Sequence, residues 1–227
     1  IWLACRTDAD APKHKGISII IVPTDAPGFE WMPLVTVGDH MTTSTYYSDV
    51  RVPVTNIVGE LNAGWQLITM QLNHERVGLA ALSGLTERLL DDVVAWCRET
   101  PSGTADGAMM IDVAWVQSDL AKCTATCKAI RLITWRLVHA VAENSLGPAE
   151  ASSVKVFGTE QVVEVYRTLQ GILGPIAHLR SDSPGAFLHG ELERANRAAQ
   201  INTFGGGVNE IQRDLVATAG LGLKRSR

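Results

Sequence analysis

The stretch that decides the fold is "WQLITMQLNHERVGLAALSGLTERLLDDVVAW", Trp65 to Trp96. Positions spaced alternately by three and four residues within it fall on one face of a helix, and nearly all of them are apolar. The positions on this face are Trp65, Ile68, Leu72, Glu75, Leu79, Leu82, Thr86, Leu89, Val93 and Trp96. Asn62 is a good N-cap, and the breaker "TPSG" begins at Thr100. The pattern therefore predicts one long helix between these two residues.

Helical periodicity continues from this helix almost to the end of the chain. It predicts helices over residues 110–144, 148–173 and 187–202, and a short last helix over 211–220. The connections carry glycine and proline, as in "SLGP" and "LGPIAHLRSDSPG". Several long antiparallel helices with short loops favour an up-and-down bundle.

The first sixty residues have a different pattern. Short runs rich in β-branched and aromatic residues, bounded by turn residues, predict strands in "IWLACRT", "ISIIIVPTDAPGF", "FEWMPLVTV" and "TSTYYSDVRVPV". The sequence thus predicts an α+β protein, with strands in residues 1–60 and helices in residues 61–227. Because the chain opens inside a strand-like run without a methionine, we expect it to be a fragment of a longer protein.

Composition narrows the class of protein. The 227 residues are 46% hydrophobic and 19% charged, which is ordinary for a globular domain with a core of its own. A net charge of −4 argues against binding to nucleic acid. No apolar stretch reaches the roughly 18 residues of a membrane span. The four cysteines lack the histidines or further cysteines of a metal site, so we expect no metal and four reduced thiols in a cytoplasmic protein.

Glu75 is the one ionisable residue on the apolar face of the first helix. Burying an ionised carboxylate without a partner is costly, so a buried glutamate holds its proton more tightly and is suited to proton abstraction. Alternatively, the apolar face fans out here and Glu75 reaches solvent or pairs with an arginine. Periodicity alone leaves both interpretations open and favours the second.

Four stretches, in order, resemble the C-terminal two domains of an acyl-CoA dehydrogenase: "GISIIIVPTDAPGF", "YYSDVRVPVTNIVGELNAGWQLI", "ASSVKVFGTE" and "FGGGVNEIQRDLVA". The positions that carry the resemblance are Asp49, Val50, Val52, Pro53, Asn56, Gly59, Gly64, Lys155 and Glu160. The resemblance implies the end of a middle β-domain in residues 1–60 and an all-α four-helix bundle in residues 61–227. The family's N-terminal helical domain would be absent from this chain.

The resemblance also implies a reaction, the α,β-desaturation of an acyl-CoA thioester. In the family a glutamate removes the α-proton, and the β-hydrogen leaves as hydride to N5 of FAD. The family's base occupies one of two positions. Here one of them is Gly206, which has no side chain, and the other is Glu75, followed by Arg76. Glu75 is therefore the expected catalytic base.

Further contacts follow from the same resemblance. It implies substrate binding by Asn73, Arg76 and Gly207, and FAD binding by Val208, Asn209 and Glu210. It also implies an electron-transfer flavoprotein or a similar electron acceptor as a partner.

The chain departs from the family where one subunit donates part of a flavin site to its neighbour. Arg98 is followed by "ETPSG" instead of a Phe-Gly pair, and Ala114 stands where the family has glutamine. In "LQGILGPIAH", Gln170 is displaced by one position, and Pro175 and Ala177 replace glycines. Proline lacks an N–H, and a Cβ intrudes where backbone should approach a phosphate.

These departures predict an α2β2 heterotetramer in which a homologous subunit donates the missing half-site. Such heterotetramers are known among acyl-CoA dehydrogenases of actinobacterial steroid catabolism, which the sequence resembles, so a steroid side-chain thioester is the expected substrate. One alternative is a homotetramer with weakened flavin binding. Another is a non-catalytic scaffold subunit. A flavin oxidase or monooxygenase on the same fold finds little support in the sequence.

Overall fold

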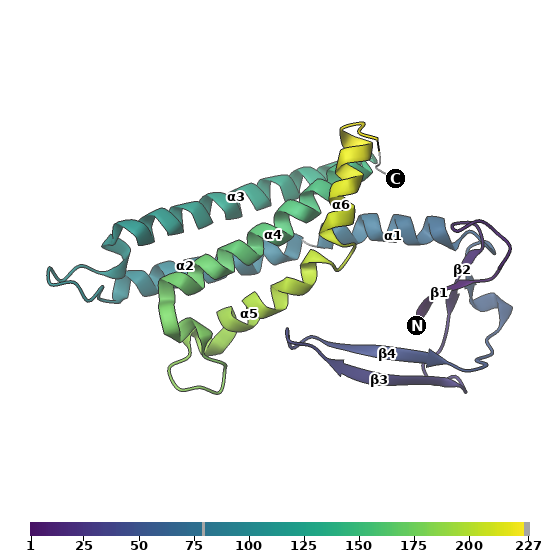
Figure 1. The fold of residues 1–227 in the computed structure, drawn as a ribbon, viewed down its shortest axis with the longest axis horizontal. Coiled ribbons are helices and arrows are strands. Elements are labelled where there is room, and N and C mark those ends of the chain that lie inside the picture. Colours follow the sequence, from purple (N-terminus) through teal and green to yellow (C-terminus); the bar gives the residue numbers. More distant parts are fainter. Residues whose placement is uncertain (79, 225–227) are drawn as a thin grey trace. The chain divides into compact units, whose positions relative to one another are not determined.

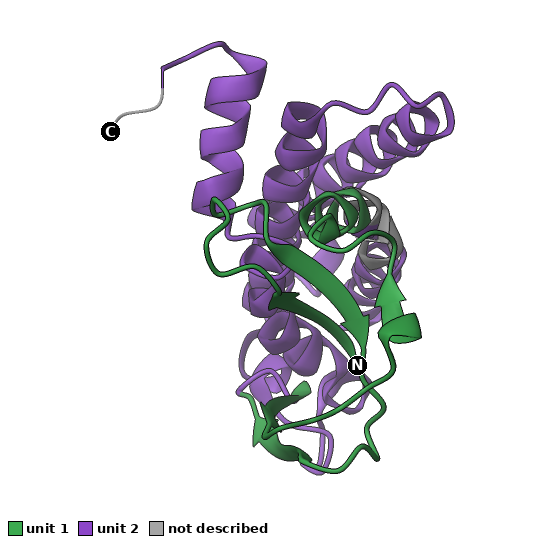
Figure 2. Ribbon diagram, turned by 90° about the vertical axis from the view of Figure 1, so that its right-hand side faces the viewer, with its two compact units in different colours: residues 1–36, 40–74 green, residues 37–39, 75–227 purple. Residues whose placement is uncertain are grey.

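The computed structural model of the chain describes residues 1–78 and 80–224, without the side chains of residues 73, 74, 76–78 and 80–82. These residues form two compact units, coloured separately in Figure 2. The first unit comprises Ile1–Thr36 and His40–His74, and the second comprises Val37–Asp39 and Glu75–Arg227. The division falls inside a helix, directly before Glu75.

The first unit contains two antiparallel sheets. Their strands are β1 (Trp2–Arg6), β2 (Ile17–Ile21), β3 (Phe29–Val35), β4 (Met41–Tyr47) and β5 (Ile57–Val58). One sheet has the order β1-β2-β5, and β3 pairs with β4 in the other. The fourth predicted strand ends early, because Asp49 adopts a positive φ of 51° and Pro53 lacks the N–H that a ladder needs. The pattern did not predict β5.

The remainder of the chain is helical, which confirms the α+β class (Figure 1). The helices are α1 (Gly64–Gly78), α2 (Ala80–Glu99), α3 (Ala114–Ala142), α4 (Pro148–Leu173), α5 (Glu191–Ala199) and α6 (Asn209–Leu215). Helices α2, α3, α4 and α5 pack side by side as a bundle. The predicted fourth helix is interrupted: 3-10 turns, Phe187–Gly190 and Gln200–Thr203, flank α5. The last helix continues as a π-turn, Val216–Gly220.

The predicted N-cap of the first helix is wrong. Asn62 has a φ of 67°, its backbone N–H donates to Ser18 Oγ at 2.8 Å, and its Oδ1 accepts a hydrogen bond from Thr7 Oγ1 at 2.5 Å. The helix begins at Gly64, where a Cβ would lie 2.8 Å from the carbonyl carbon of Ser18. Close approach to β2, rather than side-chain capping, therefore sets the start of α1.

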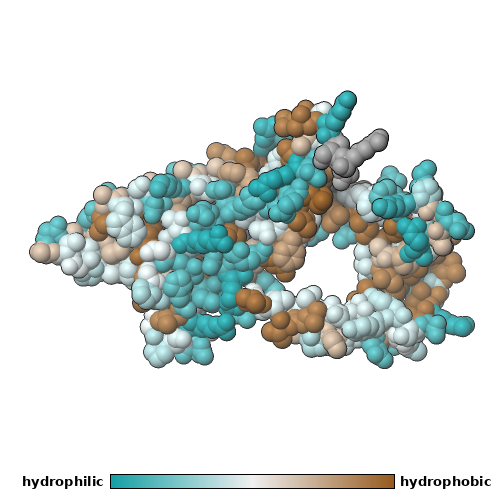
Figure 3. Space-filling view, in the orientation of Figure 1, coloured by the Kyte–Doolittle hydropathy of each residue, from teal (hydrophilic) through white to brown (hydrophobic). Residues whose placement is uncertain are grey.

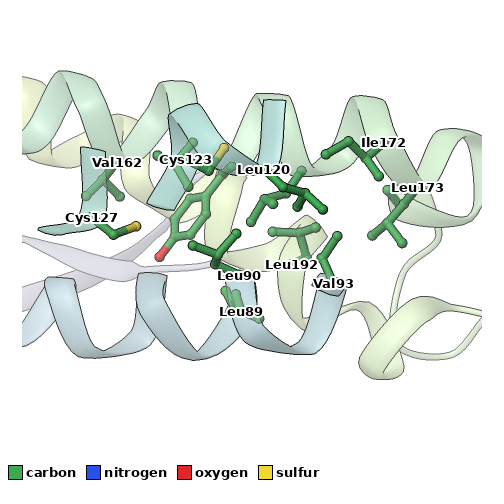
Figure 4. Packing of buried hydrophobic residues seen from close by; sticks show 14 of the residues in the cluster. Leu89, Leu90, Val93, Leu120, Cys123, Cys127, Val162, Ile172, Leu173 and Leu192 are labelled. Carbon is green, nitrogen blue, oxygen red and sulfur yellow. The ribbon is translucent and has the colours of Figure 1, made fainter. Parts of the chain in front are cut away.

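The hydrophobic core lies within the bundle. In Figure 4, Leu89, Leu90 and Val93 of α2 face residues from the other helices of the bundle. The apolar face of the Trp65–Trp96 stretch is confirmed in this half, where Thr86, Leu89 and Val93 are all buried. The hydroxyl of Thr86 lies 3.0 Å from that of Tyr166, which satisfies the one polar member.

The first half of the same face is not buried, which corrects the expectation of a continuous apolar seam. Trp65 is 42% exposed and Glu75 is exposed. Leu79, and the side chain of Leu82, lie outside the described residues. The core-facing residues of α2 are buried because α2 packs on α3 and α4. Helix α1, in contrast, makes no such extensive packing within the described part of the bundle unit.

The surface of the bundle is polar around α5. Figure 3 shows this face as mostly hydrophilic, in keeping with the acidic and basic residues of α5. Over residues 1–78 and 80–224, no helix combines the length and the apolar character needed to cross a membrane.

We expect three of the four free cysteines to resist alkylation in the folded protein. Cys97, Cys123 and Cys127 are buried, and burial raises the pKa of Cys123 to about 11 and that of Cys127 to about 12. Because the reactive thiolate is scarce below such a pKa, iodoacetamide at mildly alkaline pH should modify no cysteine other than Cys5. Mass spectrometry checks this, with urea-unfolded protein as the control in which all four react. Alkylation of Cys123 in protein that keeps its helical circular dichroism would contradict the prediction.

Candidate functional site

Glu75 and the segment before α6 form the candidate site. This segment, Phe204–Val208, is called the glycine loop because its centre is Gly205, Gly206 and Gly207. Both belong to the bundle unit. A Cβ placed on Gly206 would lie 3.9 Å from Glu75 Oε1. The two positions that the resemblance offers for a catalytic base therefore face each other across one small space.

The space beside Glu75 is open. Apart from Gly206 and its chain neighbours Gly205 and Gly207, Glu75 Oε1 is the one atom of the described residues within 4 Å of that Cβ position. Glu75 is exposed, so the described part of the chain does not bury its carboxylate, which agrees with the alternative that periodicity alone favoured. The glycine loop next to it contributes no side chain from Gly205, Gly206 or Gly207. A carboxylate beside an open space of this kind can accept a proton from a ligand placed there.

The glycine loop needs its glycines. Gly206 has a φ of 67° and Gly207 a φ of 109°, which side chains on L-residues rarely adopt. A Cβ on Gly207 would also overlap Nε2 of Gln212, a buried residue of α6. The loop is held by its own backbone, since Gly205 N–H donates to Ile201 O at 2.8 Å and Gly207 N–H to Phe204 O at 3.2 Å.

Substituting the two glycines separately should give unequal effects. Gly206→Ala introduces backbone strain alone, which costs about 1–2 kcal/mol of unfolding free energy. Gly207→Ala adds displacement of Gln212, whose Oε1 accepts a hydrogen bond from Ser152 Oγ at 2.9 Å. We expect roughly 1–3 kcal/mol more for the disturbed buried group. Urea unfolding of the two variants side by side checks this, and equal losses would contradict the geometry.

The residues predicted to bind substrate and FAD lie in different environments. Val208 and Glu210 are exposed, whereas the side chain of Asn209 is buried. Asn209 Nδ2 donates to Glu160 Oε1 at 3.0 Å, so a contact from Asn209 to a ligand would have to come from its backbone. The side chains of Asn73 and Arg76 lie outside the described residues. These binding roles, like that of Gly207, stay predictions.

The turn after α4 is closed on itself. Gln170 is buried, and its Nε2 donates to the carbonyl of Ala177 at 3.3 Å. Ala177 is buried as well, within the 3-10 turn Gly174–His178 that also contains Pro175. The glutamine therefore points into its own subunit, and the turn does not present it to a neighbour.

Sequence reasoning gave no role to a set of polar residues behind the glycine loop, although Lys155 is one of the positions that carry the family resemblance. Ser152, Lys155 and Thr159 are buried on α4 at steps of three and four residues, on the face that continues into its apolar part. The signal that could have found them is their spacing, because polar residues stand at positions that continue the apolar face of the helix. They connect α4 to Asn209 and Gln212 of α6.

Comparison with known proteins identifies the family. Residues 62–221 match the family model described as acyl-CoA dehydrogenase, C-terminal domain. The chain belongs to the acyl-CoA dehydrogenase family. Acyl-CoA dehydrogenases are oxidoreductases and are flavin-dependent in general.

Relatives and solved structures agree. The chain is 48% identical over 232 residues to acyl-CoA dehydrogenase FadE26 of Mycobacterium tuberculosis, covering 100% of this chain and 57% of the relative. It is 56% identical to the Tcur3481-Tcur3483 steroid ACAD, with a TM-score of 0.93 over 100% of this chain and 57% of the other. For the ChsE4-ChsE5 complex of Mycobacterium tuberculosis the identity is 50% and the TM-score 0.90, covering 99% and 57%. The chain thus spans little more than half the length of these acyl-CoA dehydrogenases.

Proposed function

We propose that this chain is the base-bearing part of an acyl-CoA dehydrogenase that introduces a double bond between Cα and Cβ of an acyl-CoA thioester. The observation that carries the proposal is the carboxylate of Glu75 beside the bare backbone of Gly206, with 3.9 Å between Oε1 and the Cβ position. In this family that pair of positions is where a base is expected, and Glu75 is the member that has a carboxylate. We propose that the α-carbon of the thioester comes next to this exposed carboxylate.

The chemistry asked of the chain is proton transfer. A thioester carbonyl makes the adjacent C–H acidic, and a carboxylate held next to that carbon can take the proton. FAD, when bound, supplies the acceptor for the β-hydrogen as hydride. Glu75 is exposed in this chain, so we propose that the substrate, the flavin and other parts of the assembled enzyme exclude water from it.

We further propose that the chain works in an α2β2 heterotetramer with a homologous subunit. Gln170 points inward, and the following turn contains Pro175, which lacks an N–H. This chain therefore has no good phosphate-binding turn to donate to a neighbour. Two of its structural neighbours are two-component assemblies by their names, Tcur3481-Tcur3483 and ChsE4-ChsE5. One of them is named a steroid ACAD, so we propose a steroid side-chain thioester as substrate. An electron-transfer flavoprotein as acceptor is proposed from the family resemblance alone.

A non-catalytic scaffold subunit is the second candidate. The departures at Ala114, Pro175 and Ala177 favour it, because a subunit that donates no flavin contacts could serve assembly alone. The two candidates differ in where the base lies. If this chain is a scaffold subunit, the partner has its own carboxylate at an equivalent position, and Glu75 of this chain is dispensable.

Co-expression of the full-length chain with a homologous subunit tests the proposal. We expect an α2β2 complex with about two FAD per tetramer, and anaerobic bleaching of the flavin by an acyl-CoA with a steroid side chain. Short-chain and medium-chain acyl-CoAs are the comparison substrates. A stable homotetramer with four FAD would contradict the heteromer, and a complex that no acyl-CoA reduces would contradict the dehydrogenase function.

A further inference from the structure

Lys155 lies directly behind the glycine loop. It is only 1% exposed, and its ammonium group donates to the carbonyls of Thr203 at 3.0 Å and Gly207 at 2.6 Å. A third bond reaches Oδ1 of Asn209, the first residue of α6, at 2.5 Å. The ammonium has three N–H donors, so these bonds use all of them. One side chain of α4 therefore holds the residue before the loop, the last glycine of the loop and the start of the next helix.

Asn209 is fixed in turn by its other contacts. Its Nδ2 donates to Thr159 Oγ1 at 3.2 Å and to Glu160 Oε1 at 3.0 Å. Because these partners accept hydrogen bonds from the amide nitrogen, the amide oxygen is directed to Lys155. The carboxylate of Glu160 also pairs with Arg213 at 2.7 Å. The side-chain amide of Asn209 thus links the carboxylate of Glu160 to the buried ammonium of Lys155 by two hydrogen bonds.

A second connection supports the same loop. Ser152 Oγ donates to Gln212 Oε1 at 2.9 Å, and Gln212 Nε2 occupies the position that a Cβ on Gly207 would need. The loop-anchoring network consists of Ser152, Lys155, Thr159, Asn209 and Gln212. These are five of the nine polar residues that are buried in the described part of the chain. More than half of the buried polar residues in the described part of the chain therefore lie behind the glycine loop.

A network of this kind is not needed merely to dock α6 on α4. Burying a charged amine and several amides is costly unless each hydrogen bond is made, and apolar residues would pack two helices more cheaply. A fully satisfied buried network does fix one arrangement of the groups that it joins. Here the groups include the carbonyls of Thr203 and Gly207, on either side of residues 204–206.

We propose that Lys155 is a positioning residue, which sets the distance between the backbone of Gly206 and the carboxylate of Glu75 by holding the carbonyls of Thr203 and Gly207. This inference rests on the proposed function of Glu75 as the base. Without the ammonium, the glycine-rich loop has many backbone conformations available, and the space for the thioester loses its fixed wall. Small displacements of groups around a reacting carbon lower rates strongly.

Lys155→Met in the full-length holoenzyme tests the inference. Methionine has a similar length and no donors. We expect amides of residues 204–209 to exchange with deuterium at least about tenfold faster, and the rate constant of anaerobic flavin reduction by substrate to fall roughly 10- to 100-fold. The fraction of flavin that is finally reduced should stay unchanged. A purely structural defect would do the reverse: it would lower that fraction by removing active molecules and would leave the rate constant of the remaining molecules intact.

Tyr166→Phe is the matched control. It deletes a buried hydrogen bond of α4, to Thr86, within the same bundle but outside the network. Its reduction rate constant should stay within about twofold of wild type while its thermal midpoint falls. If Lys155→Met does not fold, Ser152→Ala probes the network more mildly and should loosen the same amides.

Two results would overturn the positioning role. One is unchanged exchange at residues 204–209, and the other is a Lys155→Met reduction rate constant equal to that of Tyr166→Phe. Failure of the proposed function would look different: Glu75→Gln would keep full activity, while the exchange measurement would still report on Lys155.

Discussion

Glu75→Gln is expected to lower the rate of flavin reduction by acyl-CoA about 10²- to 10⁴-fold, the range that a positioned general base contributes. Glutamine keeps the size and the hydrogen-bonding reach of the side chain, but it cannot accept the α-proton. Because Glu75 faces open space rather than the core, we expect folding and flavin content to be unchanged. Stopped-flow absorbance of the anaerobic complex measures the rate constant directly.

A matched control is available on the neighbouring helix. Glu99 is exposed at the end of α2, so Glu99→Gln removes the same charge from the same unit without touching the glycine loop. It should reduce flavin at the wild-type rate. Retention of more than a few per cent of the rate by Glu75→Gln would exclude it as the base and favour the scaffold candidate.

Leu169→Ala should destabilise the bundle by about 3 kcal/mol, within the range measured for large-to-small substitutions in close-packed cores. Leu169 of α4 has 0% exposure and belongs to the cluster that joins α2, α3, α4 and α5. Removing its branched end leaves a cavity as well as losing apolar burial. Urea unfolding followed by far-ultraviolet circular dichroism gives the change in unfolding free energy.

Leu132→Ala is the control for this substitution. Leu132 is 61% exposed on α3, so the same atoms are removed from the surface of the same bundle. Its unfolding free energy should change by less than about 1 kcal/mol. Similar losses in the two variants would show that the core described here is not the one that stabilises the protein.

Much of the fold could be predicted from local patterns. The bounds of α4, Pro148–Leu173, agree with the predicted helix because proline begins it and "LGP" ends it. The helix α3 and the strands β1 and β3 also follow from periodicity. The errors fall where tertiary contacts override local preference: Asn62 is tied to Ser18 instead of capping α1, and two-residue β5 exists through its pairing with β2.

The sequence by itself determined the family, which the match of residues 62–221 to the family model shows. It also singled out Glu75 as the candidate base, because Glu75 precedes Arg76 and Gly206 has no side chain. Only the tertiary structure decided that these two positions meet, that Glu75 is exposed, and that Lys155 anchors the loop opposite it. The physical reason is that periodicity shows which residues share a face of a helix. Which faces are then covered, and by which distant segment, depends on how the chain returns on itself.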